Sequence, residues 1–147
     1  GGGEGVDRSS APHRQIADLG LENAVDIAGQ RDQDALFDAA RAASFYLQTS
    51  REEGMAMSVM EAMTLGLVPV VTPVGEIAHY AQAAKNAVVV HDDAAAAAEV
   101  LALLDDPDRF GRLSGAARAT WSEQRLYHED FTAACTRLLE GDPACAG

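Results

Sequence analysis

Glu53 and Glu61 flank seven residues that contain Gly54 and the first turn of an apolar helical pattern. The backbone N–H groups at the N-terminus of a helix can hold a phosphate, and the helix dipole favours negative charge there. An ordinary surface helix instead carries its acidic residues along one solvated stripe. The placement of the two acids therefore indicates either a helix terminus that they stabilise or a ligand that binds at this terminus.

Each acid also has a structural interpretation that needs no ligand. Ser58 and Glu61 stand in the S-x-x-E relation of a capping box, in which the serine serves a backbone N–H and the glutamate reaches back to the cap. Glu53 fits a solvated loop acid placed where the helix dipole favours it. Short motifs of this kind have a high false-positive rate, so both interpretations remain open at this point.

The whole chain has the composition of a folded domain. Its 147 residues are 48% hydrophobic and 23% charged, and a chain of this length buries about 70% of the surface that it exposes when unfolded. No apolar run approaches the ~20 residues of a membrane span, and the first residues lack the features of a signal peptide. Cys135 and Cys145 form neither a disulfide framework nor a metal-ligand pattern. We therefore expect a cytoplasmic location.

The formal net charge of -12 argues against large polyanionic partners but not against a pocket for a small anionic ligand. Broad binding to nucleic acid requires a basic stripe that neutralises phosphates, and we predict no nucleic-acid partner. A small anionic ligand remains compatible with this charge, because a helix N-terminus binds a phosphate through its own N–H groups.

The apolar pattern alternates between short runs rich in β-branched residues and longer helical periods. Strands are predicted at residues 25–29, 44–48, 68–72 and 87–90, the last two buried on both faces. Helices are predicted at residues 10–18, 33–42, 57–65, 76–83, 93–104, 107–121 and 127–139. This alternation predicts an α/β fold with a parallel sheet and flanking helices.

Capping residues support several of these boundaries. Ser9 or Ser10 suits the first helix, Asp32 suits the second, and Gly66 suits the end of the third. Asp92 or Asp93 suits the start of the alanine-rich helix at residues 93–104. We predict one domain over residues 1–141 and a frayed tail at residues 142–147.

The spacing of the whole segment resembles a known family. The Glu-x7-Glu pattern, with glycine after the first acid and Ala-Met after the second, precedes a glycine, a Pro-Val-Val run and Gly75. This is similar to the donor-binding half of the retaining GT-B glycosyltransferases, the glycosyltransferase group 1 or family 4-like enzymes. Further similar segments lie at residues 19–29, 36–50 and 73–79, and the resemblance covers residues 1–113. It implies the C-terminal, Rossmann-like half of a GT-B fold, with additional C-terminal helices.

The resemblance implies roles for individual residues. The matching positions are Glu53, Gly54, Met55, Ala56, Met57, Ser58 and Glu61, together with Gly29, Gln30 and Arg31 in an earlier loop. Glu53 would be the catalytic residue that contacts the transferred sugar, and Glu61 would accept hydrogen bonds from ribose hydroxyls. Backbone N–H groups at residues 55–58 would meet sugar hydroxyls and phosphate oxygens, and the loop at residues 29–31 would lie along the nucleobase.

The implied reaction is retaining transfer of a sugar from a UDP- or GDP-linked donor to an acceptor, as in carbohydrate biosynthesis. Such transfer passes through an oxocarbenium-like state and releases a nucleoside diphosphate. The family resemblance suggests that the leaving phosphate helps to deprotonate the acceptor, and it implies no cofactor and no metal ion. Electrostatic stabilisation of the departing phosphate then contributes most to catalysis.

We expect the chain to be part of a longer protein. Its glycine-rich start looks like the loop after a strand, although a flexible lead is an equal alternative. The family's phosphate-binding Arg and Lys lie upstream of this region, as does the domain that binds the acceptor. A sugar, lipid or small-molecule acceptor would be held by that domain, and any membrane contact would lie outside this chain. The isolated chain is therefore expected to be inactive.

Three positions depart from the family pattern. Met55 replaces a common aromatic residue, Ala56 replaces a common glycine, and Glu76 replaces the second glycine of a Gly-Gly pair. These departures leave room for a non-catalytic α/β nucleotide-binding or interaction domain that kept the fold. A GT-B-shaped sugar-nucleotide epimerase is a further alternative, although its catalytic histidines and acids cannot be placed here.

Several other side chains have plain structural interpretations. The methionines at positions 57, 60 and 63 are spaced as core residues of a helix, and Trp121 is predicted to anchor packing. His79 is predicted to be a surface or capping residue. The arginines of the late helices, at positions 109, 112, 118 and 125, indicate a solvated face.

Overall fold

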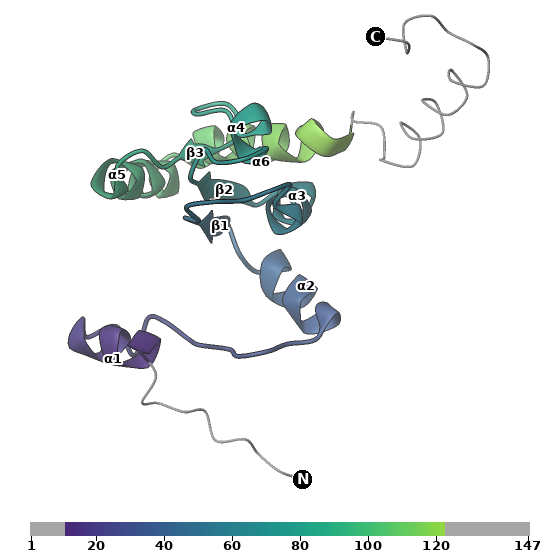
Figure 1. Cartoon of the computed structure of the whole chain (residues 1–147). Coiled ribbons are helices and arrows are strands. Elements are labelled where there is room, and N and C mark those ends of the chain that lie inside the picture. Colours follow the sequence, from purple (N-terminus) through teal and green to yellow (C-terminus); the bar gives the residue numbers. More distant parts are fainter. Residues whose placement is uncertain (1–10, 123–147) are drawn as a thin grey trace, which may run out of the picture. The chain divides into compact units, whose positions relative to one another are not determined.

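The computed structural model describes residues 11–122 of the chain (Figure 1). The chain divides into two compact units, Gly1–Ala39 and Ala40–Gly147. The first unit contains helix α1 (Ala11–Asp18), and helix α2 (Gln33–Arg41) extends across the boundary. Both helices agree with the sequence prediction, and the side chain of Asp32 caps α2 by accepting a hydrogen bond of 2.8 Å from the N–H of Ala35.

The predicted strand at residues 25–29 is wrong. These residues form no strand in the structure, and the N–H of Val25 bonds the carbonyl of Leu21 within a turn. A strand requires a neighbouring strand for its backbone hydrogen bonds. No strand partner for this segment occurs in the described part of the chain, so the apolar pattern alone did not form a ladder.

The second unit is built around a parallel sheet of three strands. Strand β1 (Phe45–Gln48) pairs with β2 (Val68–Val71), which in turn pairs with β3 (Val88–Val89). The strands lie in the sheet in the same order as in the chain, and a helix connects each strand to the next, as the alternating pattern predicts. β2 is buried along its whole length, which explains its continuous apolar sequence.

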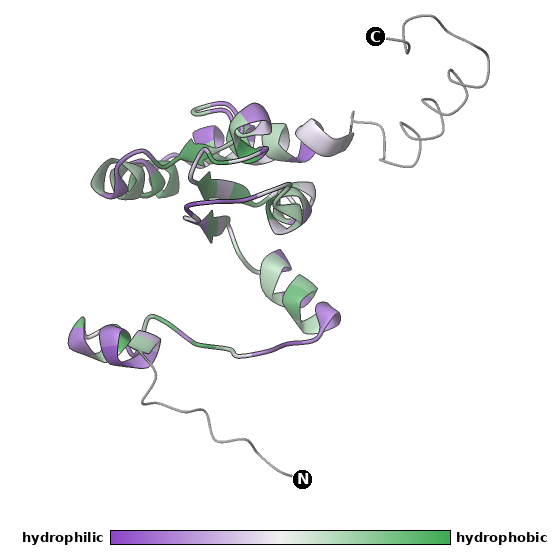
Figure 2. Ribbon diagram, viewed as in Figure 1, coloured by the Kyte–Doolittle hydropathy of each residue, from purple (hydrophilic) through white to green (hydrophobic). Residues whose placement is uncertain are grey.

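Four helices pack around this sheet in the described part of the unit. They are α3 (Met57–Thr64), α4 (Ile77–Tyr80), α5 (Asp93–Leu104) and α6 (Pro107–Ser122). α3 and α4 form one core cluster with Val71, while α5 forms another with Val68 and Val70. Because alternate residues of a strand point to opposite faces, the clusters lie on the two faces of the sheet. Figure 2 shows the corresponding concentration of hydrophobic residues on the strands.

Helix α6 ties the two clusters together. Ala117 packs in the cluster with α3, and Leu113, one turn earlier, packs in the cluster with α5. Trp121 contacts the first cluster, its indole N–H lies 3.4 Å from the sulfur of Met63, and its ring meets that of Tyr80 edge-on at a centroid distance of 5.1 Å. The prediction that Trp121 anchors packing is confirmed.

Helix ends in this unit follow the predicted caps. Gly66 has φ +85°, and the N–H groups of Gly66 and Leu67 bond the carbonyls of Met63 and Ala62. These paired bonds are a Schellman motif, which requires the left-handed residue that glycine supplies. Asp92 caps α5 by accepting a hydrogen bond of 2.8 Å from the N–H of Ala95.

Helix α4 is much shorter than the predicted helix at residues 76–83. It ends at Tyr80, because Ala81 is extended and Ala84 has φ +60°. The cause is Asn86, whose side chain accepts a hydrogen bond from the N–H of Gln82 and donates one to the carbonyl of Tyr80. The buried amide thus takes the backbone groups that a longer helix would have used.

Two further predictions are only partly right. Met63 is fully buried and Met60 partly so, but Met57 is 56% exposed and does not belong to the core. Arg118 is exposed as expected, yet its guanidinium donates to the carbonyl of Leu65, and Arg109 forms an ion pair with Glu99. The predicted helix at 127–139, the tail at 142–147, the caps Ser9 and Ser10 and the arginine at position 125 lie outside the described residues. The single domain over residues 1–141 stays a prediction.

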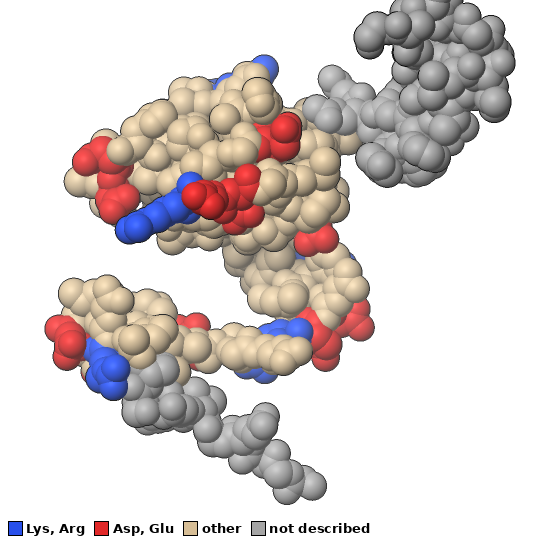
Figure 3. All heavy atoms as spheres, in the orientation of Figure 1, with Lys and Arg blue, Asp and Glu red and all other residues tan. Residues whose placement is uncertain are grey.

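On the face shown in Figure 3, some basic side chains lie beside acidic ones and others lie apart from them. None of the helices in residues 11–122 combines the length and the apolar character that crossing a membrane requires.

Candidate functional site

The predicted site residues of the second unit lie in the loop that leaves β1 and in the first turns of α3. Ligands of open α/β sheets bind at the carboxyl ends of the strands, and this loop follows the carboxyl end of β1 directly. Glu53 is partly buried, whereas Gly54, Met55, Met57, Ser58 and Glu61 are exposed. An added Cβ at Gly54 would meet no protein atom within 4 Å, so packing does not explain the glycine.

Helix α3 begins in an uncommon way. Its N-cap residue is Ala56, which is 9% exposed and has the left-handed backbone φ 48°, ψ 59°. An alanine has no side-chain oxygen, so no side chain of the cap residue accepts from the first-turn N–H groups. The capping box of Ser58 and Glu61 is therefore wrong, because Ser58 lies inside the helix rather than at its cap.

Ser58 belongs to a polar network that the sequence did not indicate. Gln48, the last residue of β1, donates a hydrogen bond of 2.6 Å from Nε2 to Oε1 of Glu53. Its Oε1 accepts 3.1 Å bonds from the hydroxyls of Tyr46 and Ser58. The network links the sheet, the loop and α3, and it fixes the carboxylate of Glu53 in one orientation. The signal available in the sequence was a polar residue at the end of an apolar strand.

The loop after β2 packs against the same segment. Gly75 has φ +52°, and a Cβ at this position would overlap the carbonyl oxygen of Glu53 and lie 2.8 Å from that of Gly54. The N–H of Glu76 donates a hydrogen bond of 3.2 Å to the carbonyl of Gly54. The close approach of the two backbones therefore requires glycine at position 75. This contact holds the loop after β2 against the loop after β1.

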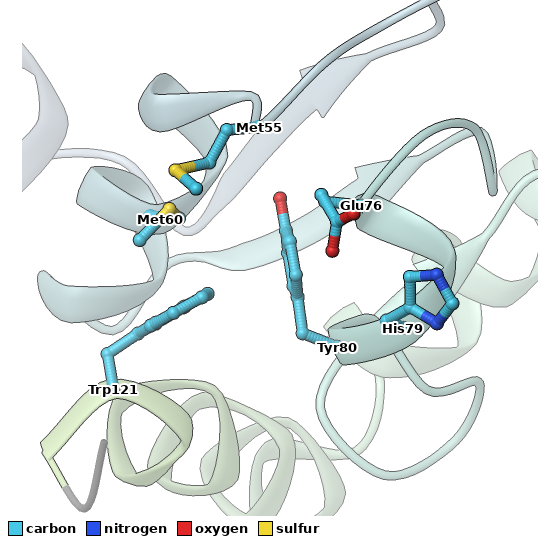
Figure 4. A pocket seen from close by; sticks show the side chains of 6 residues that line it. All are labelled: Met55, Met60, Glu76, His79, Tyr80 and Trp121. Atoms are coloured by element: carbon cyan, nitrogen blue, oxygen red, sulfur yellow. The ribbon is translucent and has the colours of Figure 1, made fainter. Parts of the chain in front are cut away.

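A cavity of about 260 Å³ opens beside these two loops. It is lined by Met55, Met60, Glu76, His79, Tyr80 and Trp121 (Figure 4). The hydroxyl of Tyr80 is buried and has no hydrogen-bond partner among the described residues. Burial raises the pKa of Tyr80 to about 12, and the negative charges of Glu53 and Glu76 act in the same direction. The phenol is therefore a proton donor at neutral pH. His79 is exposed, as predicted.

The remaining predicted site residues belong to the first unit. Gly29, Gln30 and Arg31 lie in the exposed segment between α1 and α2, where Gly29 has φ +65°. Their place along a nucleobase stays a prediction. Within residues 11–122, no group of three or more His, Cys, Asp or Glu residues is arranged to hold a metal ion.

Two curated relatives align with most of the chain. One is the GDP-mannose:cellobiosyl-diphosphopolyprenol alpha-mannosyltransferase of Xanthomonas oryzae pv. oryzae, 28% identical over 74% of this chain. The other is the D-inositol 3-phosphate glycosyltransferase of Thermobispora bispora, 32% identical over 82% of this chain. The chain spans 30% of the length of each of these relatives.

The fold matches that of solved structures. The structure of HepE from Anabaena in complex with UDP superimposes on this chain with a TM-score of 0.77 at 21% identity, covering 88% of this chain and 36% of HepE. The same protein in complex with UDP-glucose gives a TM-score of 0.76. At this identity the likeness concerns the fold, and it confirms the predicted Rossmann-like parallel sheet of a GT-B protein.

The profile of one family matches most of the sequence. It is described as glycosyl transferases group 1, and the match runs over residues 2–120. The match includes β1, β2, β3, the loop of Glu53 and the whole of α3. The chain belongs to the glycosyl transferases group 1 family.

Proposed function

We propose that this chain is the donor-binding part of a retaining glycosyltransferase and that it binds a nucleotide-sugar at the N-terminus of α3. The observation that carries the proposal is the open start of this helix. Ala56 provides no side-chain acceptor, and a Cβ added at Gly54, two residues before it, would meet open space. Uncapped N–H groups and the positive end of the helix dipole together favour a diphosphate.

The acids of the segment are placed to recognise hydroxyl groups. Glu53 is oriented by Gln48 and would contact the transferred sugar, while the exposed Glu61 on α3 would accept hydrogen bonds from the ribose. Residues 29–31 would contact the nucleobase. The carboxylate of Glu53 would stabilise the positive charge of the oxocarbenium-like transition state, while the N–H groups at the start of α3 would stabilise the negative charge on the departing diphosphate.

The relatives support a UDP- or GDP-linked donor without naming the sugar. One relative is a GDP-mannose enzyme, and the HepE structures contain UDP and UDP-glucose. The chain spans 30% of the length of this relative. The acceptor-binding domain and the Arg and Lys side chains that hold the diphosphate would lie in the remaining part of the enzyme. We therefore expect binding by this chain alone, but no transfer.

Thermal unfolding in the presence of UDP, GDP or ADP tests this proposal. A ligand at ten times its dissociation constant adds about 1.4 kcal/mol, which raises the melting temperature by roughly 3–5 °C for a domain of this size. Glu61→Ala is expected to abolish the shift, because the ribose contact is lost. Glu52→Ala removes the same charge from an exposed neighbour and should leave the shift intact. The absence of a shift with all three nucleotides would contradict donor binding by this chain.

A further inference from the structure

We propose that the cavity lined by Met55, Glu76 and Tyr80 is the subsite for the sugar ring of the nucleotide-sugar. In this subsite the hydroxyl of Tyr80 donates a hydrogen bond to a sugar hydroxyl, and the carboxylate of Glu76 accepts one. The inference rests on the proposed function and assigns part of its specificity to residues outside the Glu-x7-Glu segment.

The unpartnered hydroxyl of Tyr80 is the first observation. Tyr80 is 9% exposed, its oxygen is buried, and no described residue accepts or donates a hydrogen bond to it. Buried polar groups are nearly always paired, and an unpaired one costs the free energy of its desolvation. A phenylalanine would fill the same space without this cost. A ligand that pairs with the hydroxyl gives the tyrosine a function that packing does not.

The chemistry of the cavity suits a sugar ring. Its wall combines the aromatic side chains of Tyr80 and Trp121 with the carboxylate of Glu76 and the imidazole of His79 (Figure 4). Aromatic faces pack against the C–H groups of a sugar, while the polar groups pair with its hydroxyls. At about 260 Å³ the cavity lies below the usual range of about 300–1,000 Å³ for ligand pockets, which favours a single ring over a nucleotide.

The cavity borders the loop between β1 and α3, which carries Glu53 and Gly54. Met55 forms part of its wall and directly follows Glu53 and Gly54 in that loop. Glu76 lines the cavity with its side chain and bonds Gly54 through its backbone N–H. A diphosphate at the N-terminus of α3 would therefore place its attached sugar close to the cavity.

Met55 provides a route to the buried hydroxyl. In Figure 4 the hydroxyl end of Tyr80 points between Met55 and Glu76. The side chain of Met55 is unbranched and 54% exposed, so it can move aside at little cost when a sugar enters. Glu76 stands where the family pattern has glycine. Its role as a hydrogen-bond acceptor for the sugar would explain this departure.

Paired titrations of the chain with UDP and UDP-glucose, and with GDP and GDP-mannose, test the subsite. Tyr80→Phe removes only the hydroxyl and keeps the ring packing against Trp121. We expect it to weaken the preferred nucleotide-sugar about 3- to 10-fold, the effect of one neutral hydrogen bond, while binding of the bare nucleoside diphosphate stays within 2-fold. The melting temperature of the unliganded variant should not fall, because the hydroxyl has no partner there.

Glu76→Gln and Glu76→Ala add a second comparison. The amide keeps an acceptor oxygen, so Glu76→Gln should retain more of the sugar-dependent affinity than Glu76→Ala does. Equal weakening of nucleotide and nucleotide-sugar by Tyr80→Phe, or no change in either, would overturn the assignment of the subsite.

The outcomes separate this inference from the proposed function. If the wild-type chain binds neither nucleotides nor nucleotide-sugars, the proposed function fails and the subsite fails with it. If it binds a nucleoside diphosphate and gains or loses nothing from the sugar, only the subsite is wrong. Binding of free methyl glucoside or methyl mannoside that depends on Tyr80, without such dependence for the nucleotide-sugars, would assign the cavity to a separate sugar and overturn the donor assignment.

Discussion

Gly75 lies directly against the carbonyl group of Glu53, so that a Cβ at position 75 would overlap the carbonyl oxygen. The contact joins the loop after β2 to the loop after β1, and the hydrogen bond from the N–H of Glu76 to the carbonyl of Gly54 lies beside it. Two segments that are more than 20 residues apart in the chain thus form one surface at the carboxyl edge of the sheet.

Gly75→Ala is expected to destabilise the fold by about 2 kcal/mol or more. The new methyl group meets backbone atoms that cannot rotate away, and φ +52° is strained for any residue with a Cβ. Chemical denaturation measures this loss. Gly115→Ala is the matched control: it lies within α6 with open space around it, and we expect a gain of up to about 1 kcal/mol. Equal stability of the two variants would contradict the close approach at Gly75.

Ser58→Ala should lose no more than about 0.5 kcal/mol, because Ser58 does not cap α3 and the variant loses one exposed hydrogen bond to Gln48. Asp92→Ala should lose about 1 kcal/mol, since its carboxylate caps α5 through the N–H of Ala95. Urea unfolding measures the free energy of unfolding of both variants, and so compares the motif residue Ser58 with the observed cap Asp92. A loss at Ser58 as large as that at Asp92 would restore the capping box.

Asn86→Ala is expected to lose about 2–3 kcal/mol of stability. Asn86 is 3% exposed, and its amide bonds the N–H of Gln82, the carbonyl of Tyr80 and the hydroxyl of Thr120. Removing the amide leaves the N–H of Gln82 and the carbonyl of Tyr80 without this partner, while the hydroxyl of Thr120 keeps its bond to the carbonyl of Ala116. Lys85→Ala, at an exposed neighbour, should stay within about 0.5 kcal/mol. Thermal unfolding of both variants provides the comparison.

Stability should fall with rising pH between about pH 10 and pH 12 because of Tyr80. Burial raises the pKa of Tyr80 from 10.0 to about 12, so the folded state keeps a proton that the unfolded state has released. The contribution is present in full below pH 10 and is lost as the pH rises through 12. Tyr80→Phe should remove this part of the pH dependence, whereas all other titrating groups are common to both proteins. Parallel slopes for the two proteins would show that the phenol is not buried as described.

Gln48→Leu should weaken binding of the nucleotide-sugar about 10-fold, on the proposal that Glu53 contacts the sugar. Gln48 donates the 2.6 Å hydrogen bond that orients the carboxylate of Glu53, and a charge-assisted bond of this kind is stronger than a neutral one. Tyr46→Phe removes only the outer bond to Gln48 and should have a smaller effect. Isothermal titration of both variants measures the two affinities. An equal effect of the two substitutions would contradict the role of Gln48 in orienting the carboxylate of Glu53.

Local chemistry and periodicity were sufficient to predict much of the fold. The apolar runs of β1 and β2 and the acids that cap α2 and α5 act through neighbours in the chain, so their effects can be read in order. The family resemblance located the segment from Glu53 to Glu61, because its glycine and acids occur at a fixed spacing.

Contacts between distant residues decided the rest. Val25 and its neighbours form no strand because a strand needs a partner, and α4 stops at Tyr80 because Asn86 takes its backbone groups. The support of Glu53 by Gln48, the close approach of Gly75, and the burial of the hydroxyl of Tyr80 likewise depend on elements that meet only after folding. Residue types and spacing determined which chemical groups this site has, whereas the packing of β1, α3 and the loop after β2 decided which of them are oriented, exposed or left without a partner.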